Sequence, residues 1–315
     1  MRSATLRHRL EYAGFRTLLL VLRALPERVA LALGSGLGWL AGGALRMRRD
    51  VVDANLALAF PDRDERWRGR VAAESYRHLG REGVMAFRLG RAPARVVLER
   101  TDVDGLEALR DAVASGRGAV VVTGHLGNWE VGGAAVSVRG VAIDAVAFRQ
   151  ANPLFDDDLV RNRSRLGMRV VRKGDAPQAV LRALREGRVP ALVADQDARR
   201  GGVFVDFMGV PAATARGPAV FALRAGADLF LGVALAREGR PRRYHVRLEP
   251  VRVERTGDVE EDVRRLTAAH TAALEAWVRR APEQYFWQHR RWRTRPPEIR
   301  GTAAPSQEPA PPSPV

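Results

Sequence analysis

The sequence predicts an α/β fold, with a largely parallel central sheet flanked by helices and an N-terminal helical region. From about residue 118 onward, short apolar runs rich in β-branched residues alternate with stretches of helical pattern. This alternation is typical of βα units, whose strands lie parallel under a cover of helices. The 315 residues are enough to bury a full core, so we expect one large domain with appendages.

Each strand is predicted from a short apolar run that stops at a polar residue or a glycine. The predicted strands are 119–122, 141–148, 168–171, 189–194, 229–235 and 244–248. The predicted helices between and after them are 106–114, 155–166, 176–186, 217–225 and the amphipathic segment 259–280. Residues 50–100 also have a helical pattern, and the final residues 301–315, rich in proline, serine and alanine, are predicted to be a disordered tail.

The N-terminal part of the chain, residues 12–45, is predominantly apolar. Its longest uncharged run, 29–45, has about 17 residues, which is the lower limit for crossing a bilayer, and its glycines weaken it as an isolated helix. The basic cluster Arg46, Arg48 and Arg49 that follows suits anionic lipid headgroups. We therefore expect residues 1–50 to be membrane-associated, with a pair of buried core helices as the alternative.

Composition restricts the possible partners and chemistry. The formal net charge of +16 indicates an anionic partner, and nucleic acid, an anionic membrane surface, a phosphorylated lipid and an acidic carrier protein all fit that description. The chain has no cysteine, which excludes disulfides, thiolate metal sites and a cysteine nucleophile. Neither a G-x-S-x-G elbow nor a phosphate-binding P-loop occurs in the sequence.

The segment GAVVVTGHLGNWE, residues 118–130, is the centre of the predicted sheet. A buried strand ends near residue 123 and a helix begins after Asn128, a good N-cap residue. His125 and Glu130 therefore lie at a strand-to-helix turn, at the edge where α/β proteins place reactive groups. A carboxylate bonded to one imidazole nitrogen raises the basicity of the other, so His125 is a candidate general base. A histidine that merely caps the turn beside a surface glutamate is the alternative.

No metal site is evident, because His125 lacks a second histidine at zinc-protease spacing. Asp195 and Asp197 follow the predicted strand 189–194, where hydrogen bonding to loop amides is a more common role than cation binding.

His125 and Glu130 form an H-x4-E motif. With this motif the chain resembles the lysophospholipid acyltransferase superfamily, most closely the bacterial lipid A biosynthesis acyltransferases that add lauroyl or myristoyl chains. The resemblance covers most of the chain, roughly residues 11–297. The segments that carry it, in addition to the central GHLGNWE, are NLALAFP (55–61), YRHLG (76–80), FRQANP (148–153), DQD (195–197), FMGVPA (207–212), PEQYFW (282–287) and HRRW (289–292).

The resemblance implies a glycerol-phosphate-acyltransferase-like fold and direct acyl transfer without a cofactor or metal. His125 would deprotonate a hydroxyl of a lipid A precursor as it attacks the thioester of acyl carrier protein. Glu130 would hold His125, and backbone N–H groups near Gly124 or Gly127 would bind the oxyanion. The candidate substrate-binding residues are Arg149, Arg161, Arg163, Asp195 and Gln196.

The resemblance also implies a place of action, the cytoplasmic face of the bacterial inner membrane. Residues 51–300 would form the acyltransferase domain, and the partners would be acyl carrier protein, the lipid A precursor and an anionic membrane surface rather than nucleic acid. Acylation of another glycolipid or a lysophospholipid, such as a phosphatidylinositol mannoside, is the alternative in the same class. A non-enzymatic basic binder of membranes or nucleic acid is the alternative from a different class.

Overall fold

The computed structural model describes residues 4–239 and 241–296, and the predicted tail at 301–315 lies outside these residues. The helices are α1 (Leu6–Ala24), α2 (Glu27–Trp39), α3 (Arg49–Ala59), α4 (Glu65–Leu89), α5 (Ala94–Arg100), α6 (Leu106–Ala114), α7 (Trp129–Ser137), α8 (Pro153–Arg165), α9 (Ala176–Arg185), α10 (Gly217–Ala225) and α11 (Val259–Arg280). The strands are β1 (Thr101–Asp104), β2 (Ala119–Thr123), β3 (Ile143–Ala147), β4 (Arg169–Arg172), β5 (Val189–Val193), β6 (Gly202–Phe207), β7 (Val210–Ala215), β8 (Asp228–Arg237) and β9 (Arg243–Val251).

The main sheet confirms the predicted α/β class. Its seven strands have the order β1-β9-β8-β2-β5-β3-β4, and every neighbouring pair is parallel except the antiparallel pair β8–β9. The six predicted strands are all present with small shifts of their ends, whereas β1 and the separate β6–β7 hairpin were not predicted. The central strand β2 pairs with β8 on one side and β5 on the other.

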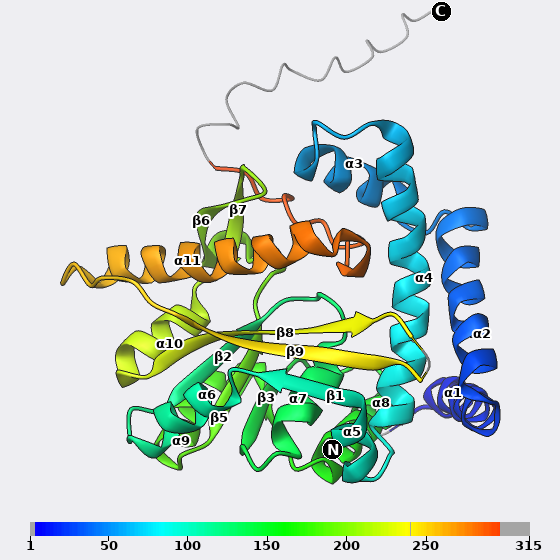
Figure 1. The fold of residues 1–315 in the computed structure, drawn as a ribbon, viewed down its shortest axis with the longest axis horizontal. Helices are drawn as coiled ribbons and strands as arrows, with labels where there is room; N and C mark the ends of the chain where they lie inside the picture. Colours follow the sequence, from blue (N-terminus) through cyan, green and yellow to red (C-terminus); the bar gives the residue numbers. More distant parts are fainter. Residues whose placement is uncertain (1–3, 240, 297–315) are drawn as a thin grey trace, which may run out of the picture.

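Helices cover both faces of this sheet (Figure 1). Val120 and Val122 of β2 face a core that includes residues of α10 and α11, whereas Ala119 and Val121 face a second core formed with α6 and α7. A strand that is buried on both faces needs apolar residues at consecutive positions, which explains the unbroken apolar run that predicts β2.

The long helix α4 stands between the sheet and the N-terminal helices α1 and α2 (Figure 1). Glycines allow α2 and α4 to approach each other closely. A Cβ at Gly80 of α4 would lie 1.9 Å from the carbonyl oxygen of Gly34, and a Cβ at Gly38 of α2 would lie 2.0 Å from that of Tyr76. The glycines that weaken this run as an isolated helix therefore fix it against α4.

The other side of the N-terminal helices leaves many large apolar side chains exposed. They are Leu6, Leu10, Leu18, Leu20, Val21, Val29, Leu33, Leu37 and Trp39. Within the described residues, no single helix combines the length and the apolarity of a membrane span. One pair bent by 88°, Glu27–Ala44 with Arg49–Ala59, meets both criteria when taken together.

We predict that Gly80→Ala lowers the free energy of unfolding by about 1–3 kcal/mol, because the added methyl group forces α4 away from α2. Gly69→Ala in the same helix is the control, since a Cβ there has open space around it. The control should be neutral or raise the free energy of unfolding by up to about 1 kcal/mol. Urea unfolding followed by circular dichroism measures both, and equal stabilities of the two variants would contradict the close-packing interpretation.

Candidate active site

His125 lies in the loop that joins the carboxyl end of β2 to α7. The loop is held against β8, because Gly127 forms a bridge with Ala234. Gly127 has a φ of +62°, and a Cβ there would lie 2.0 Å from the carbonyl oxygen of Ala234, so this position requires glycine. Asn128 then caps α7 as predicted, since its side chain accepts a hydrogen bond of 3.1 Å from the backbone N–H of Val131.

Asp195 is the carboxylate that holds His125. Its Oδ1 lies 2.7 Å from Nδ1 of the imidazole, and its Oδ2 accepts a 2.7 Å hydrogen bond from the backbone N–H of His125. The two residues meet because β2 and β5 are parallel neighbours with Thr123 opposite Val193, so both loops leave the sheet at the same edge. Since Nδ1 donates to the carboxylate, Nε2 keeps its lone pair and is the basic nitrogen.

Burial lowers the pKa of His125, but the charge and hydrogen bond of Asp195, together with the charge of Glu130, raise it more, so the net pKa is above its ordinary value. Burial alone would raise the pKa of Asp195. The charge of protonated His125, the hydrogen bonds from His125 and the charge of Arg291 outweigh this and hold the pKa of Asp195 below its usual range. The raised pKa of His125 and the lowered pKa of Asp195 both favour an ionised carboxylate beside a basic imidazole.

The ring of His125 is held by Asp195 rather than by Glu130 as predicted, and Glu130 contributes its charge, which helps to raise the pKa of the ring. The Glu130 carboxylate forms an ion pair with Arg163 of α8 through two hydrogen bonds, one of them 3.0 Å from Nε to Oε2. Glu130 is in the first turn of α7, whereas His125 precedes the N-cap of that helix, and this places the glutamate against α8 rather than against Nδ1 of the imidazole. Asp195, from a different strand, takes the orienting position.

The predicted oxyanion donors are also only partly free. The backbone N–H of Gly127 donates to the carbonyl oxygen of Gln284 at 2.9 Å, so Gly127 is not a free donor. Gly124 lies tightly against the site, since a Cβ there would be 3.0 Å from Oδ2 of Asp195 and 2.6 Å from the side chain of Leu274.

The other predicted substrate residues divide into two groups. Gln196 lies beside the imidazole ring, with its Nε2 3.5 Å from Nε2 of His125, and Arg163 forms an ion pair with Glu130. Arg161 is exposed and lies 3.6 Å from Asp158 within α8. Arg149 is exposed beyond β3, and its side chain makes no ion pair or hydrogen bond in the part of the chain that the structure describes.

Comparison with known proteins shows the family of this chain. Residues 2–294 match the family model described as bacterial lipid A biosynthesis acyltransferase. The chain is 31% identical over 276 residues to the lipid A biosynthesis palmitoleoyltransferase of Escherichia coli K12, covering 86% of this chain and 87% of the relative. It is 32% identical over 293 residues to the lipid A biosynthesis lauroyltransferase of the same organism, covering 92% and 93%. The chain belongs to the bacterial lipid A biosynthesis acyltransferase family.

A further relative of this acyltransferase is the phosphatidylinositol mannoside acyltransferase of Mycolicibacterium smegmatis, which is 32% identical over 225 residues. That match covers 69% of this chain and 71% of the relative. The lipid A enzymes therefore match more of the chain at a similar identity.

Two cavities whose lining surface is largely apolar lie against α4 of the acyltransferase. The first has a volume of about 160 Å³ and runs along α4, with Leu79, Ala86, Trp129 and Phe286 among its lining residues, and His125 also lines it. The second, of about 120 Å³, shares Ala86 and Glu130 with the first. Its other apolar lining residues are Phe87, Leu89, Val131, Ala134, Leu159, Leu166 and Met168. Both cavities lie against α4 and share two lining residues, and we interpret them as parts of one largely apolar passage that extends from His125.

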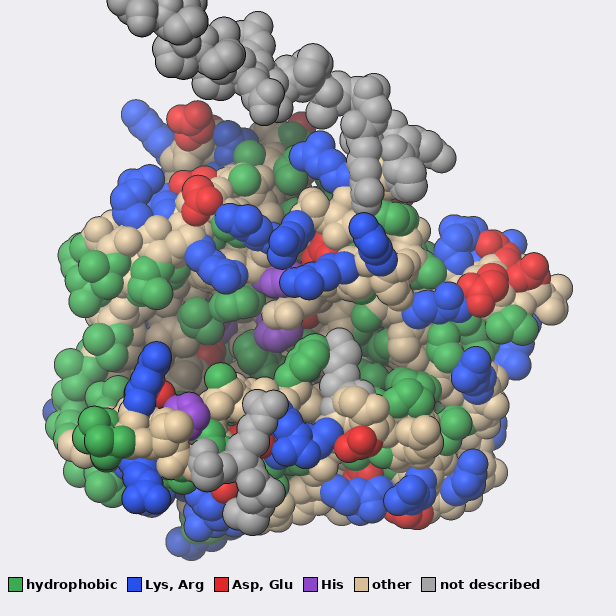
Figure 2. Space-filling view, turned by 180° about the vertical axis from the view of Figure 1, so that it is seen from behind, with side chains coloured by type: hydrophobic (Ala, Val, Ile, Leu, Met, Phe, Trp, Pro, Cys, Tyr) green, Lys and Arg blue, Asp and Glu red, His purple; other side chains and the backbone are tan. Residues whose placement is uncertain are grey.

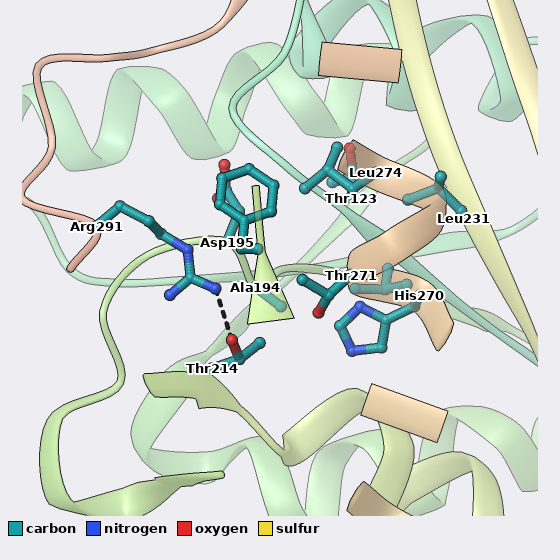
Figure 3. A pocket seen from close by; sticks show the side chains of 11 residues that line it. Thr123, Ala194, Asp195, Thr214, Leu231, His270, Thr271, Leu274 and Arg291 are labelled. Atoms are coloured by element: carbon teal, nitrogen blue, oxygen red, sulfur yellow. Dashed lines mark hydrogen bonds between the residues drawn. The ribbon is translucent and has the colours of Figure 1, made fainter. Parts of the chain in front are cut away.

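A small cavity with polar and apolar lining residues adjoins Asp195 (Figure 3). Its volume of about 10 Å³ is the size of a single water molecule, and Asp195, His270, Thr214 and Arg291 line it. Arg291, 2% exposed, donates to the carbonyl oxygen of Ala213 at 2.9 Å and to the hydroxyl of Thr214 at 2.5 Å. Burial lowers the pKa of His270 to about 4, so His270 is neutral and the guanidinium of Arg291 is the positive charge behind Asp195.

We predict that Asp195→Asn lowers the pKa of His125, because the charge and hydrogen bond that raise it are lost while burial remains. The imidazole would then stay neutral to a lower pH than in the wild type. A nuclear magnetic resonance titration of the His125 ring, assigned with His125→Gln, measures this shift. Asp197→Asn is the control, because the Asp197 carboxylate bonds to Thr294, and an equal shift in both variants would contradict the assignment.

Proposed function

We propose that this acyltransferase moves a fatty acyl chain from acyl carrier protein to a hydroxyl of a lipid A precursor at the cytoplasmic face of the bacterial inner membrane. The observation that carries the proposal is the His125–Asp195 pair at the mouth of an apolar passage. The pair supplies a base without a covalent intermediate, and the passage supplies room for a hydrocarbon chain. The names of the lipid A relatives support the acceptor class.

In the proposed reaction, Nε2 of His125 takes the proton of the acceptor hydroxyl as its oxygen attacks the thioester carbonyl. The new carbon–oxygen bond gives a tetrahedral oxyanion, whose collapse breaks the carbon–sulfur bond. The departing thiolate takes the proton from the imidazolium, so His125 returns to its neutral form. Asp195 holds the ring and stabilises its positive charge between the two proton transfers.

The oxyanion requires a donor other than the N–H of Gly127. The backbone at Gly124 stays in that role. Arg163 is a second source of positive charge, because its Nη1 is buried without a partner in the described part of the chain while its other two nitrogens bind Glu130. We assign the Glu130–Arg163 pair to the wall of the acyl passage, where it also adds to the electrostatic stabilisation of developing charge.

Acylation of a mannosylated phosphatidylinositol is the second candidate, supported by the 32% identity to the mycobacterial relative. The same base and the same passage serve either acceptor. The acceptor headgroup therefore decides between the two functions, and only a direct comparison of acceptors separates them.

We expect purified wild-type protein to transfer a labelled acyl chain from acyl carrier protein to a tetra-acylated lipid A precursor. His125→Ala and Asp195→Asn should each reduce turnover at least ~100-fold, as expected for the loss of general-base catalysis. His245→Ala is the control, because His245 forms a similar pair with Asp104 at 2.8 Å on an outer strand. Activity that survives in His125→Ala would refute the mechanism, and transfer to the mannosylated lipid alone would select the second candidate.

The exposed apolar face of α1 and α2 supports association with the membrane. Arg23 and Arg28 lie on these helices, and Arg46 and Arg48 follow them beside the exposed Leu45. Arginine beside exposed leucine is the pattern of a helix that lies in the headgroup region of an anionic bilayer. We propose that this face brings the active site to the lipid acceptor.

Leu33→Ser with Leu37→Ser should weaken binding to vesicles of anionic phospholipid by at least ~10-fold, because two leucines one helical turn apart lose their apolar burial in the bilayer. These side chains are 46% and 52% exposed. Leu98→Ser is the control, since Leu98 is 41% exposed on α5. A vesicle flotation assay measures the binding, and an equal loss in the control would argue against this face.

A further inference from the structure

Five arginines beside the catalytic pair are exposed and form no ion pair within residues 4–239 and 241–296. They lie on two short segments, 196–202 after β5 and 288–296 near the end of the described chain. The five are Arg199, Arg200, Arg290, Arg293 and Arg295. We call this group the arginine rim. Elsewhere, many arginines of this chain are paired with carboxylates, as in the pairs of Arg91 with Asp158 and Arg242 with Glu82.

Two contacts join the segments of the rim to each other. The carboxylate of Asp197 accepts hydrogen bonds from the backbone N–H of Thr294 at 2.7 Å and from its hydroxyl at 2.9 Å. The backbone N–H of Asp197 donates to Nε2 of His289 at 2.9 Å. The arginine rim is therefore one surface, and its first arginine is three residues beyond Gln196, which lies beside the ring of His125.

The rim has almost no negative charge of its own. Asp197 is the only acidic residue in the two segments, and besides Thr294 it also accepts a 2.8 Å hydrogen bond from the backbone N–H of Arg199. Its charge is thus held by loop N–H and hydroxyl groups. Figure 2 shows basic side chains gathered on one face of the molecule. A cluster of unpaired like charges opposes folding, so its presence at the mouth of a site indicates an anionic partner.

The character of the rim favours a protein partner over a lipid surface. None of the large apolar side chains exposed in the described structure lies in residues 196–202 or 288–296. Membrane-binding surfaces combine basic with exposed apolar residues. Arg46 and Arg48 show that combination, because they alternate with Leu45 and Met47, which are 63% and 57% exposed. The surface around Arg46 and Arg48, which has the composition of a lipid-binding surface, therefore differs from the arginine rim.

We propose that the arginine rim is the docking surface for the acidic carrier protein that delivers the acyl thioester to His125. This inference rests on the proposed function and adds the location of the donor. Carboxylates of the carrier would bind the guanidinium groups in bidentate fashion and steer the carrier to the mouth. The thioester would then enter beside Gln196 while the lipid acceptor approaches from the side of α1 and α2.

The test is a charge reversal, Arg199→Glu with Arg200→Glu. The dissociation constant for holo acyl carrier protein, measured by fluorescence anisotropy, should rise at least ~10-fold. The salt dependence of binding should also become weaker, because fewer charged contacts are left to screen. Arg182→Glu with Arg185→Glu is the matched control: these two arginines are exposed on α9, which ends just before the amino end of β5, and they form no ion pair in the described structure.

A kinetic measurement with two acyl donors separates binding of the carrier from the transfer reaction. Acyl pantetheine carries the thioester without the protein, so the rim variant should keep wild-type transfer from this donor while its KM for acyl carrier protein rises. Circular dichroism establishes that the variants are folded. Loss of transfer from both donors would assign the rim arginines to the reaction or to stability, and would overturn the docking proposal.

Binding is measured without turnover, so the two proposals can fail independently. Carrier binding that depends on the rim, without acyl transfer, would refute the proposed function and retain the docking surface. Equal binding of carrier protein by wild type and the rim variant would overturn the inference. So would a loss of binding to anionic phospholipid vesicles in the rim variant with carrier binding unchanged, because the rim would then be a lipid site.

Discussion

The contact between His125 and Asp195 is the interaction on which the site depends, and it exists only because β2 and β5 are parallel neighbours. Two residues 70 positions apart meet because parallel strands bring their carboxyl ends to one edge. Asp195 binds both the ring and the backbone N–H of His125, so it fixes the loop as well as the imidazole. Distortion of this strand pair would therefore remove the base and its orientation at the same time.

That contact also explains which parts of the site the sequence could predict. The run 119–122 and the cap at Asn128 are local signals, so the position of His125 follows from them. The partner of His125 is a matter of strand order, which no local pattern encodes. Glu130 is close to His125 in the sequence and was given the orienting role, yet it pairs with Arg163 of α8. Asp195 was placed in the pocket by its strand-end position, but not at the imidazole.

In the fold as well, elements with a local sequence signal were predicted and elements that depend on distant contacts were not. Helices with a strong apolar periodicity, such as α11, and strands buried on both faces, such as β2, were predicted nearly to their ends. The hairpin β6–β7 was missed: it forms a separate two-stranded sheet, and its strands alternate apolar and polar residues only weakly. Nor could β1 be predicted, because its four residues, TDVD, include two aspartates, and only its pairing with β9 makes it a strand. The glycines of α2 could be seen from the sequence to weaken an isolated helix. Their packing role could not be seen, because Gly80, which packs against Gly34, is far along the chain.

The proposed acyl transfer would require two large substrates, a carrier-bound thioester and a lipid hydroxyl, to reach one imidazole nitrogen together. A single entrance with uniform chemistry would make them compete. The two surfaces beside this site instead differ: exposed Leu45 and Met47 alternate with arginines, whereas the arginine rim has no large exposed apolar residue within its two segments. Arg48 donates to the carbonyl oxygen of Gln288 at 3.1 Å, so the two sides meet at the entrance. In the proposed reaction Nε2 of His125 would face the substrate while Nδ1 binds Asp195, so the contact that makes the ring a base would also direct it to the place where the two substrates meet.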